Sequence, residues 1–478
     1  MVGQVADGAR WVGALLAVAA SLTALLAACV RAWAALHRDR RVVAFFHPYC
    51  NDGGGGERVL WCAIAALQRA RPDLRVAVYT GDALSGERIL ANAFDRFGVT
   101  LPRRVSFVQL RLRRLLDAAS YPRVTMLGQA MGGALVAVEA LCRLTPEVFV
   151  DTMGCAGSYP VARALFGCRV ASYVHYPTIS VEMIRSVGSR IAAHNNDATI
   201  AASRWRTAAK VGYYRAFARF YAMCGRCAHA VLVNSSWTAA HIRSLWGESG
   251  VVIVFPPCDT AALAAIPLAP HAREQLVVSI AQFRPEKAHP LQLRAFARLR
   301  ERWPAEHADA QLVVIGACRC EADARRVTDL RALAAQLGLA DCVQILPDVS
   351  YAERLGWLRR AAVGLHTMWM EHFGIGVVEL MASGVVPVAH ASGGPLADIV
   401  LPVDGMPSGR LACSADEYAE AMHELLQLAR QPGREAFADL QSAARRASAR
   451  FSDESFERAF VAALNPLLGL TVALPTGR

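Results

Sequence analysis

Short apolar runs alternate with longer segments of mixed polarity along this 478-residue chain. The runs are rich in Val, Ile and Leu and too short for long helices, so they predict buried strands of parallel sheets. The first series is Arg41–Phe46, Arg75–Thr80, Val105–Leu110, Val148–Asp151, Arg169–His175, Ala230–Asn234 and Val251–Phe255. The second series is Gln275–Ala281, Gln311–Gly316, Val343–Leu346, Ala362–Thr367 and Val385–His390. Two successive series with helical segments between the strands predict an α/β protein with two Rossmann-like domains.

The stretch Pro267–Arg273 is polar and proline-containing, and it is the predicted linker between these domains. We therefore expect an N-terminal domain at 41–266 and a C-terminal domain at 267–455. The last segment, 456–478, is predicted to be a C-terminal helix and tail. Phe451–Leu468 has a helical pattern, and we expect it to pack back on the first domain.

Trp11–Val30 carries no charge and is long enough as a helix to span a hydrocarbon core of about 30 Å. Only Arg10 lies just before it, whereas several arginines, beginning with Arg31, follow it. The positive-inside rule then predicts a membrane anchor at 1–40, with the rest of the chain in the cytosol. The alternative is a cleaved signal peptide, but the apolar region is longer than such a segment requires.

Two further segments have patterns that suit a membrane surface. Val124–Leu144 is apolar but is interrupted by Glu139, which favours a core or membrane-surface helix over a spanning one. Arg204–Arg226 alternates basic and aromatic residues, a pattern typical of a helix that contacts anionic headgroups. An ordinary solvated helix face explains the second pattern equally well.

Composition and charge narrow the class of protein. Hydrophobic residues make up 54% of the chain and charged residues 19%, which excludes a disordered protein. The net charge of +11 favours anionic partners, but no basic run interleaved with aromatics indicates nucleic acid. The 13 cysteines are scattered, and those in apolar runs, such as Cys29 and Cys342, are predicted to be buried thiols in a reducing compartment. Cys224-Gly-Arg-Cys227 is a lone CxxC that weakly suggests zinc or redox chemistry.

The stretch Met370–Ala389 carries the strongest chemical signal. Glu371 and Glu379 are separated by seven residues, and a glycine-bracketed turn lies between the first of them and a predicted helix, Val377–Met381. The helix N-terminus presents free N–H groups that suit a phosphate. Eight positions along a helix cover about 12 Å, which matches a nucleotide sugar stretched from hexose to ribose. Two unrelated glutamates on an amphipathic helix would be the simpler explanation of the spacing alone.

Three other groups lie where parallel α/β sheets bind ligands. The glycines Gly53–Gly56 join the first strand to a helix predicted over Val59–Ala70, as in a phosphate-approach turn, although a plain flexible turn fits equally. His175 closes the strand that begins at Arg169. In the second domain, Arg284 and Lys287 follow the first strand, where two cations can meet a phosphate or simply be solvated.

These motifs together resemble a known family. They are His47-Pro-Tyr-Cys-Asn-Asp-Gly-Gly-Gly-Gly-Glu-Arg-Val-Leu-Trp, Val174-His-Tyr-Pro-Thr-Ile-Ser, Asn234-Ser-Ser-Trp-Thr, Gln282-Phe-Arg-Pro-Glu-Lys and Glu371-His-Phe-Gly-Ile-Gly-Val-Val-Glu. In this order they resemble the eukaryotic GDP-mannose-dependent alpha-1,2-mannosyltransferases of dolichol-linked oligosaccharide synthesis, within the retaining GT-B glycosyltransferases. The resemblance covers roughly Arg41 to Phe460 and the N-terminal anchor. It implies a GT-B fold in which an acceptor domain and a nucleotide-sugar domain face a cleft.

The resemblance also implies roles for individual residues. Glu371, His175, Lys287 and Arg284 would be catalytic, with Glu371 at the donor mannose, His175 beside the transferred sugar and the two cations on the diphosphate. Donor binding would involve Gly53, Gly54, Gly55, Gly56, Gln282, Arg284, Lys287, His372, Phe373, Gly374, Ile375, Gly376 and Glu379, the last of these holding the ribose. Many GT-B members carry Arg five residues before the Lys, where this chain has Gln282. Whether Arg284 replaces that contact is left open.

The implied reaction transfers mannose from GDP-mannose, with retention, to a dolichyl-pyrophosphate-linked oligosaccharide as its fourth and fifth mannoses. The implied location is the endoplasmic reticulum membrane, with other mannosyltransferases of the pathway as further partners. No Asp-x-Asp element lies beside the donor residues, so no metal or other cofactor is expected. The alternatives are a GT-B transferase for another nucleotide sugar, a non-catalytic membrane scaffold, and a dinucleotide oxidoreductase. The last lacks its G-x-G-x-x-G motif.

Overall fold

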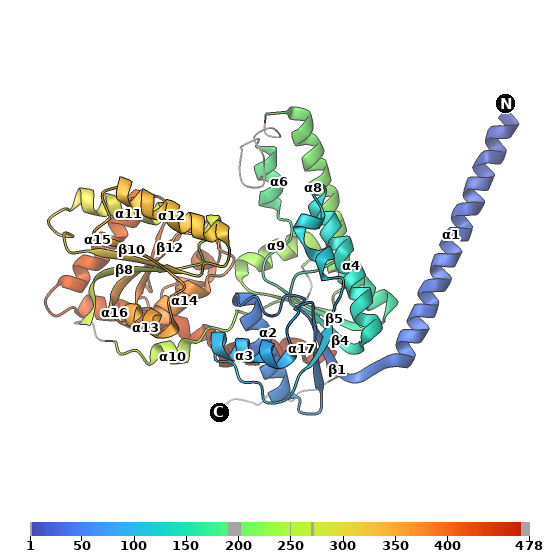
Figure 1. Cartoon of the computed structure of the whole chain (residues 1–478), viewed down its shortest axis with the longest axis horizontal. Coiled ribbons are helices and arrows are strands. Elements are labelled where there is room, and N and C mark those ends of the chain that lie inside the picture. Colours follow the sequence, from blue (N-terminus) through green and yellow to red (C-terminus); the bar gives the residue numbers. More distant parts are fainter. Residues whose placement is uncertain (1, 190–201, 249, 269–271, 470–478) are drawn as a thin grey trace. The chain divides into compact units, whose positions relative to one another are not determined.

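The structure is a computed structural model that describes residues 2–189, 202–248, 250–268 and 272–469 (Figure 1). Its chain contacts divide into two compact units. The first comprises Met1–Val233, Ala239–Val252 and Phe460–Arg478, and the second comprises Asn234–Thr238 and Ile253–Ala459. Neither unit is a continuous segment, because short pieces of chain return to the unit that they pack with.

A seven-stranded sheet, ordered β3-β2-β1-β4-β5-β6-β7, forms the centre of the first unit. The strands are β1 Arg38–Phe46, β2 Arg75–Thr80, β3 Ser106–Gln109, β4 Thr145–Asp151, β5 Arg169–Val174, β6 Ala230–Val233 and β7 Val251–Ile253. Strands β3 to β6 pair in parallel, as the buried apolar runs predicted. Phe46 packs against Tyr79 and Phe149 in the core, with ring centroids 6.4 and 5.5 Å apart.

Helices connect these strands, as expected for parallel pairing. They are α1 Val2–His37, α2 Gly55–Ala70, α3 Gly86–Phe97, α4 Thr125–Arg143, α5 Ser158–Pro160, α6 Val181–Gly188, α8 Arg204–Gly225 and α9 Ser236–Trp246. The final helix, α17 Asp453–Leu464, crosses from the second unit into the first. Within the first unit, Phe460 stacks on Phe45 at 6.5 Å, so the expected return of the C-terminal helix is confirmed.

The second unit has a six-stranded parallel sheet, ordered β10-β9-β8-β11-β12-β13. Its strands are β8 Glu274–Ile280, β9 Gln311–Gly316, β10 Val343–Pro347, β11 Ala361–His366, β12 Val386–His390 and β13 Arg410–Ala412. Its helices are α10 Thr260–Ala264, α11 His289–Arg302, α12 Glu321–Gln336, α13 Tyr351–Arg360, α14 Ile375–Ala382, α15 Ala415–Arg430 and α16 Glu435–Ser448. β13 was not predicted, because a strand of three residues leaves almost no pattern.

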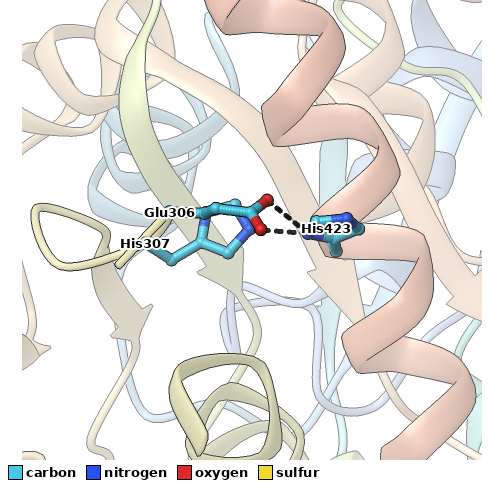
Figure 2. A group of neighbouring side chains, drawn as sticks. All are labelled: Glu306, His307 and His423. Atoms are coloured by element: carbon cyan, nitrogen blue, oxygen red, sulfur yellow. Dashed lines mark hydrogen bonds and ion pairs between the residues drawn. The ribbon is translucent and has the colours of Figure 1, made fainter. Parts of the chain in front are cut away.

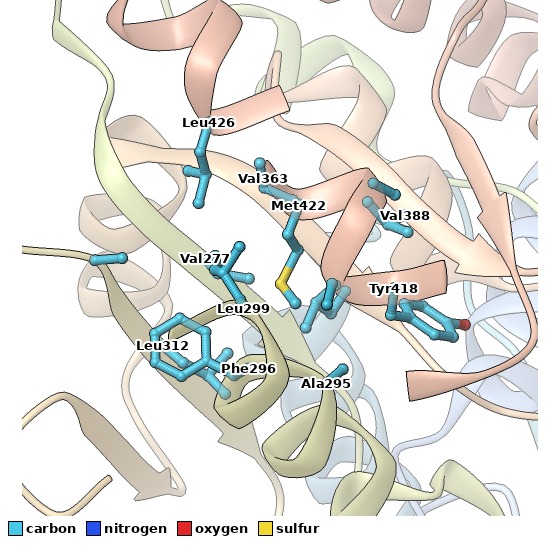
Figure 3. Packing of buried hydrophobic residues seen from close by; sticks show 14 of the residues in the cluster. Val277, Ala295, Phe296, Leu299, Leu312, Val363, Val388, Tyr418, Met422 and Leu426 are labelled. Atoms are coloured by element: carbon cyan, nitrogen blue, oxygen red, sulfur yellow. The ribbon is translucent and has the colours of Figure 1, made fainter. Parts of the chain in front are cut away.

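Both faces of this second sheet are covered. On one face α11 and α15 place Phe296, Leu299 and Met422 against Val277 and other strand residues (Figure 3). On the other face α10, α13 and α14 complete a second buried cluster. The arrangement is the doubly wound one that two-sided apolar strands predict.

Residues 253–266, which the sequence prediction placed in the N-terminal domain, pack in the second unit. The cause is burial: Leu263 and Ile266 of the α10 region are 2% and 4% exposed among residues of β8 and α14. Of the predicted linker, residues 269–271 lie outside the described part of the chain, and Arg273 is buried. The tail from residue 470 onwards also lies outside it.

The glycine loop departs from its prediction in one respect. The helix expected to begin at Val59 begins at Gly55, so two of the glycines are helical. The Glu57 carboxylate accepts a hydrogen bond from the Gly54 N–H, which stabilises this extra turn and offsets the low helix propensity of glycine.

The structure describes the expected membrane segments to different extents. Trp11–Val30 lies inside α1; most side chains before Ser21 are outside the description, and Leu22, Leu25 and Leu26 beyond it are exposed. Among the described residues, one helix, α4, is long and apolar enough to cross a membrane, and about a third of its most apolar window is buried. A core helix passes the same test, so α4 is weak support for a membrane span.

The predicted burial of two cysteines is corrected by the structure. Cys29 is exposed, and Cys342 is half-buried at the edge of the hydrophobic core of the second unit; all thirteen cysteines are free thiols. Asn234, in a formal glycosylation sequon, has only 5% of its surface exposed, which makes it a poor glycan acceptor in the folded protein.

Candidate active site

Charged side chains gather at the carboxyl edge of the second sheet. The loop after β8 carries Lys287, and β11 ends at His366 and leads to Glu371. Because parallel strands end at the same edge, residues far apart in sequence meet there. The predicted association of the Lys287 loop with the Glu371 segment is therefore seen directly.

Glu371 is the centre of this cluster. The Lys287 ammonium donates to its Oε2 atom, and His366 Nε2 lies 3.1 Å from the same oxygen. Burial alone would raise the pKa of the Glu371 carboxyl, but the charge of Lys287 and the His366 hydrogen bond outweigh burial and hold that pKa well below its usual range. Glu371 is therefore a fixed anion with a defined orientation.

The backbone around Glu371 is held by the turn after β12. Met370 has φ +55°, and its N–H donates to Ser392 Oγ at 2.8 Å. Gly394 N–H donates to the Glu371 carbonyl at 2.7 Å, and a Cβ atom on Gly393 would collide with that carbonyl. The adjacent glycines directly after a strand were the sequence signal for this support, and it was not recognised.

Contacts with β11 fix the Lys287 loop. Thr367 Oγ1 donates to the Lys287 carbonyl at 2.9 Å, and Gln292 Nε2 donates to Thr367 Oγ1 at 3.0 Å. Arg284 is exposed and forms no ion pair with any described residue. Its backbone N–H donates to the Gln282 carbonyl at 2.7 Å, which places the two side chains on one short turn. The Arg284 guanidinium is thus available to an anionic ligand.

Helix α14 begins beside this cluster. Its N-cap, Gly374, has φ +113° and provides no side-chain cap, so the first N–H groups face no acceptor from the N-cap side chain. At Gly376 the backbone approaches the Ile280 carbonyl so closely that a Cβ atom would lie 3.1 Å from it. Glu379, on the same helix, is half-buried and pairs with Arg354 of α13 at 3.7 Å. Sequence reasoning did not identify Arg354.

Residues between Glu371 and the helix differ in what they can contact. Phe373 is 3% exposed and its ring packs 5.8 Å from Phe255, so only its backbone is available to a ligand. The His372 ring lies 5.3 Å from Trp237, another residue of this unit.

The first unit assembles a second group at its own sheet edge. Gly53 has φ +74°, which favours glycine, and His175 Nε2 lies 3.4 Å from the position a Cβ atom would take on Gly56. His175 and the glycine loop, two groups that the sequence singled out separately, therefore lie close together within this unit. The Glu57 carboxylate accepts from the Gly54 N–H and so occupies part of the loop's donor capacity.

Sequence reasoning missed the support beneath this loop. His47 bridges Thr152 at 2.7 Å and Glu57 at 3.3 Å. Burial would raise the pKa of Glu57, but the hydrogen bond and charge of His47 lower it overall. Asp151 is fully buried at the end of β4 and accepts from Tyr159 at 2.6 Å. The positions of these residues at strand ends were the available signal.

Comparisons with known proteins support the fold. Two solved structures share the fold: Anabaena HepE in complex with UDP and glucose has a TM-score of 0.59, with 16% identity and coverage of 89% of this chain and 99% of that one. Sucrose-phosphate synthase from Thermosynechococcus elongatus has a TM-score of 0.62, with 16% identity and coverage of 90% and 100%. The predicted GT-B class, with two Rossmann-like units, is confirmed.

Sequence families and relatives identify the chain more closely. Residues 40–246 match "ALG11 mannosyltransferase N-terminus", and residues 267–446 match "Glycosyl transferases group 1". The mouse GDP-Man:Man(3)GlcNAc(2)-PP-Dol alpha-1,2-mannosyltransferase is 47% identical over 90% of this chain and 88% of its own length. The human protein of that name is 44% identical with the same coverage, and the Dictyostelium discoideum protein is 42% identical over 89% and 85%. With this identity maintained over nearly the whole chain, the protein belongs to the ALG11 family of alpha-1,2-mannosyltransferases.

Proposed function

We propose that the chain transfers mannose from GDP-mannose, in alpha-1,2 linkage, to a dolichyl-pyrophosphate-linked oligosaccharide of the N-glycan precursor pathway. It adds the fourth and fifth mannoses, with retention of configuration. The names of the relatives support this donor and acceptor. The observation that carries the proposal is the fixed Lys287–Glu371–His366 cluster beside the open N-terminus of α14.

The roles follow from charge and position. Glu371 accepts hydrogen bonds from hydroxyl groups of the donor mannose, since it is ionised and oriented before any ligand arrives. Glu379, farther along α14, holds the ribose, with Arg354 fixing its carboxylate. Gly53–Gly56 and His175 contribute from the first unit, where they lie together.

Negative charge grows on the diphosphate as the bond to mannose breaks. Arg284, Lys287 and the N–H groups of α14 supply the stabilising positive field, so no metal is required. Attack occurs on the face from which the diphosphate leaves, and the departing phosphate takes the proton of the acceptor hydroxyl. No carboxylate of this chain is assigned a covalent role.

The proposed location is the endoplasmic reticulum membrane, with α1 as a single anchor and both units in the cytosol. The exposed leucines of α1 after Ser21 support contact with lipid. Other mannosyltransferases of the pathway are proposed partners, and nucleic acid is not.

The decisive experiment incubates the detergent-solubilised protein with GDP-mannose and a lipid-pyrophosphate trimannosyl chitobiose acceptor. Mass spectrometry should show two added hexoses, removed by an alpha-1,2-specific mannosidase. Glu371→Gln should abolish the products, whereas Glu321→Gln, at an exposed position of α12, should not.

The same assay separates the alternatives. Inhibition by free UDP rather than GDP would indicate a different nucleotide-sugar donor. If the folded protein formed no product with any donor tested, it would be a non-catalytic scaffold.

A further inference from the structure

A cluster of metal-ligating side chains lies in the second unit, outside the residues assigned to the donor. Glu306 and His307 lie on the loop after α11, and His423 projects toward them from α15 (Figure 2). One ligand atom from each of the three lies within 4.8 Å of the others. Neither the family assignment nor the proposed reaction uses them.

The distances are close to those of a tetrahedral metal site. His307 Nε2 and His423 Nδ1 are 3.0 Å apart, and His423 Nδ1 is 3.7 Å from Glu306 Oε2. Zinc bonds of about 2.0–2.1 Å at tetrahedral angles place neighbouring ligand atoms about 3.3 Å apart. Glu306 Oε2 accepts a hydrogen bond from Gln427 Nε2, and a small movement of this exposed side chain, with loss of that hydrogen bond, brings all three atoms onto one ion.

Contacts with Trp303 hold the two histidine side chains, His423 and His307, in place. The His423 ring stacks on Trp303, with centroids 3.9 Å apart and planes 9° from parallel. His307 is 1% exposed, and its backbone N–H donates to the Trp303 carbonyl at 3.2 Å. The donor atoms are thus arranged before an ion binds, which reduces the entropy lost on binding.

The local charges also permit a cation. Two nearby arginines are already paired, Arg302 with Glu420 and Arg430 with Asp309. The hydrogen bond between His307 Nε2 and His423 Nδ1 contains one proton, which an ion would displace, and Nδ1 of His307, which has no partner among the described residues, can carry the His307 proton instead.

We propose that Glu306, His307 and His423 bind one transition-metal ion of the zinc class, with water in the remaining position. Two imidazole nitrogens and a carboxylate favour Zn²⁺, Co²⁺, Ni²⁺ or Cu²⁺ over the oxygen-preferring Mg²⁺ and Ca²⁺. The ion joins the loop after α11 to α15 and stabilises the second unit. It takes no part in the transfer of mannose.

Cobalt is the probe, because tetrahedral Co²⁺ absorbs visible light and reports its ligands. The full-length protein, freed of metal by chelation and dialysis, is titrated with Co²⁺, and Zn²⁺ is then added in competition. We expect one equivalent of tetrahedral Co²⁺, displaced by Zn²⁺, without the ultraviolet band of Co–thiolate bonds. The thiolate band matters because Cys224 and Cys227 are an alternative binding pair.

Three variants locate the ion. His423→Asn and Glu306→Gln each remove one ligand from a partly exposed position and should weaken binding about tenfold or more. Glu420→Gln, an exposed control on the same helix, should bind as the wild type does. Zn²⁺ should raise the melting temperature of the wild type and the control, but not that of the two ligand variants.

A wild-type protein without stoichiometric tetrahedral cobalt would overturn the proposal. So would a cobalt affinity that is unchanged from the wild type in both His423→Asn and Glu306→Gln, or a spectrum with the thiolate band. Circular dichroism of each variant distinguishes a lost ligand from a lost fold.

Discussion

At the scale of single residues, Glu371 and Glu379 are predicted to affect different kinetic constants. In the proposed function Glu371 contacts the donor mannose, where geometry and charge change during reaction, so Glu371→Gln should mainly lower kcat while GDP binds nearly as well. The proposed role of Glu379 is to hold the ribose in both the ground state and the transition state, so Glu379→Gln should raise the KM for GDP-mannose and weaken GDP binding. Losing one charge-assisted hydrogen bond costs about 1.5–3 kcal/mol, so each effect should be about tenfold or more.

Steady-state kinetics and GDP titration of both variants check this assignment. A Glu371→Gln protein that no longer binds GDP, beside a Glu379→Gln protein that still does, would reverse the two roles. Unchanged kinetics in both would place the site elsewhere.

His366 is predicted to act through Glu371. Its Nε2 atom is 3.1 Å from the carboxylate, and it is buried at the end of β11. His366→Leu removes this donor and should lower kcat about tenfold or more, whereas His366→Gln places an amide N–H near the same position and should restore most of the activity. Equal activities of the two variants, measured with equal melting temperatures, would rule out a positioning role.

The sequence predicts the residues of this site unevenly. Glu371, Glu379 and Lys287 stand in linear motifs whose spacing is itself the signal, and the structure places Lys287 against Glu371. His366 and Ser392 contact the Glu371 segment because they lie at the ends of neighbouring strands. The order of the strands in the sheet decides this proximity, and no local sequence pattern predicts it. The pairing of Glu379 with Arg354 likewise depends on how α13 packs beside α14.

At the scale of elements, the open N-terminus of α14 leads to a prediction about metal. Because its N–H groups and two cations supply the positive field, turnover should survive an excess of EDTA. Initial rates with EDTA and with added manganese measure this directly. The rates are measured before folded protein is slowly lost. EDTA would also remove an ion from the proposed site at Glu306, which would lower the stability of the protein without changing the transfer of mannose. Immediate loss of activity, restored by manganese, would refute the prediction.

The start of α11 should make stability depend on pH. Burial, Lys287 and His366 lower the pKa of His289 to about 4 from its ordinary 6.5. The folded state thus binds this proton less readily than the unfolded state, so its contribution to stability is complete above about pH 6.5 and is lost progressively down to about pH 4.

His289→Asn tests that dependence, because it keeps an amide donor near Nδ1 and removes the titration. The free energy of unfolding, from denaturant titrations, should fall with decreasing pH less steeply in this variant, by up to about 1.4 kcal/mol per pH unit. Parallel curves for variant and wild type between pH 6.5 and 4.5 would contradict the assignment. Below that range the unfolded state also takes up a proton at Glu371 that the folded state does not bind, which lowers the free energy of unfolding further.

The elements themselves were predicted well where an apolar run is long. β2 and β9 have the predicted ends, and other strands differ by a few residues. The pattern fails where tertiary contacts decide: β13 exists because its three residues pair with β12, and α2 begins early because Glu57 caps it.

At the scale of the whole molecule, α1 predicts a topology. With one N-terminal anchor and basic residues after it, protease added to sealed microsomes should digest both units. Antibodies to the C-terminus would follow the digestion, and a lumenal marker would confirm that the vesicles are sealed. Protection of the body, or a glycan at Asn234, would invert the topology; the burial of Asn234 already argues against the glycan.

The return of the C-terminus to the first unit has a consequence for biosynthesis. Phe460 stacks on Phe45, and Arg169 donates to the Leu467 carbonyl at 2.6 Å, so residues translated after the second unit complete the first unit. During synthesis, the apolar surface of β1 therefore stays uncovered until α17 leaves the ribosome. A chain truncated shortly before residue 460 would leave that surface permanently exposed. We expect such a chain to be bound by chaperones and degraded.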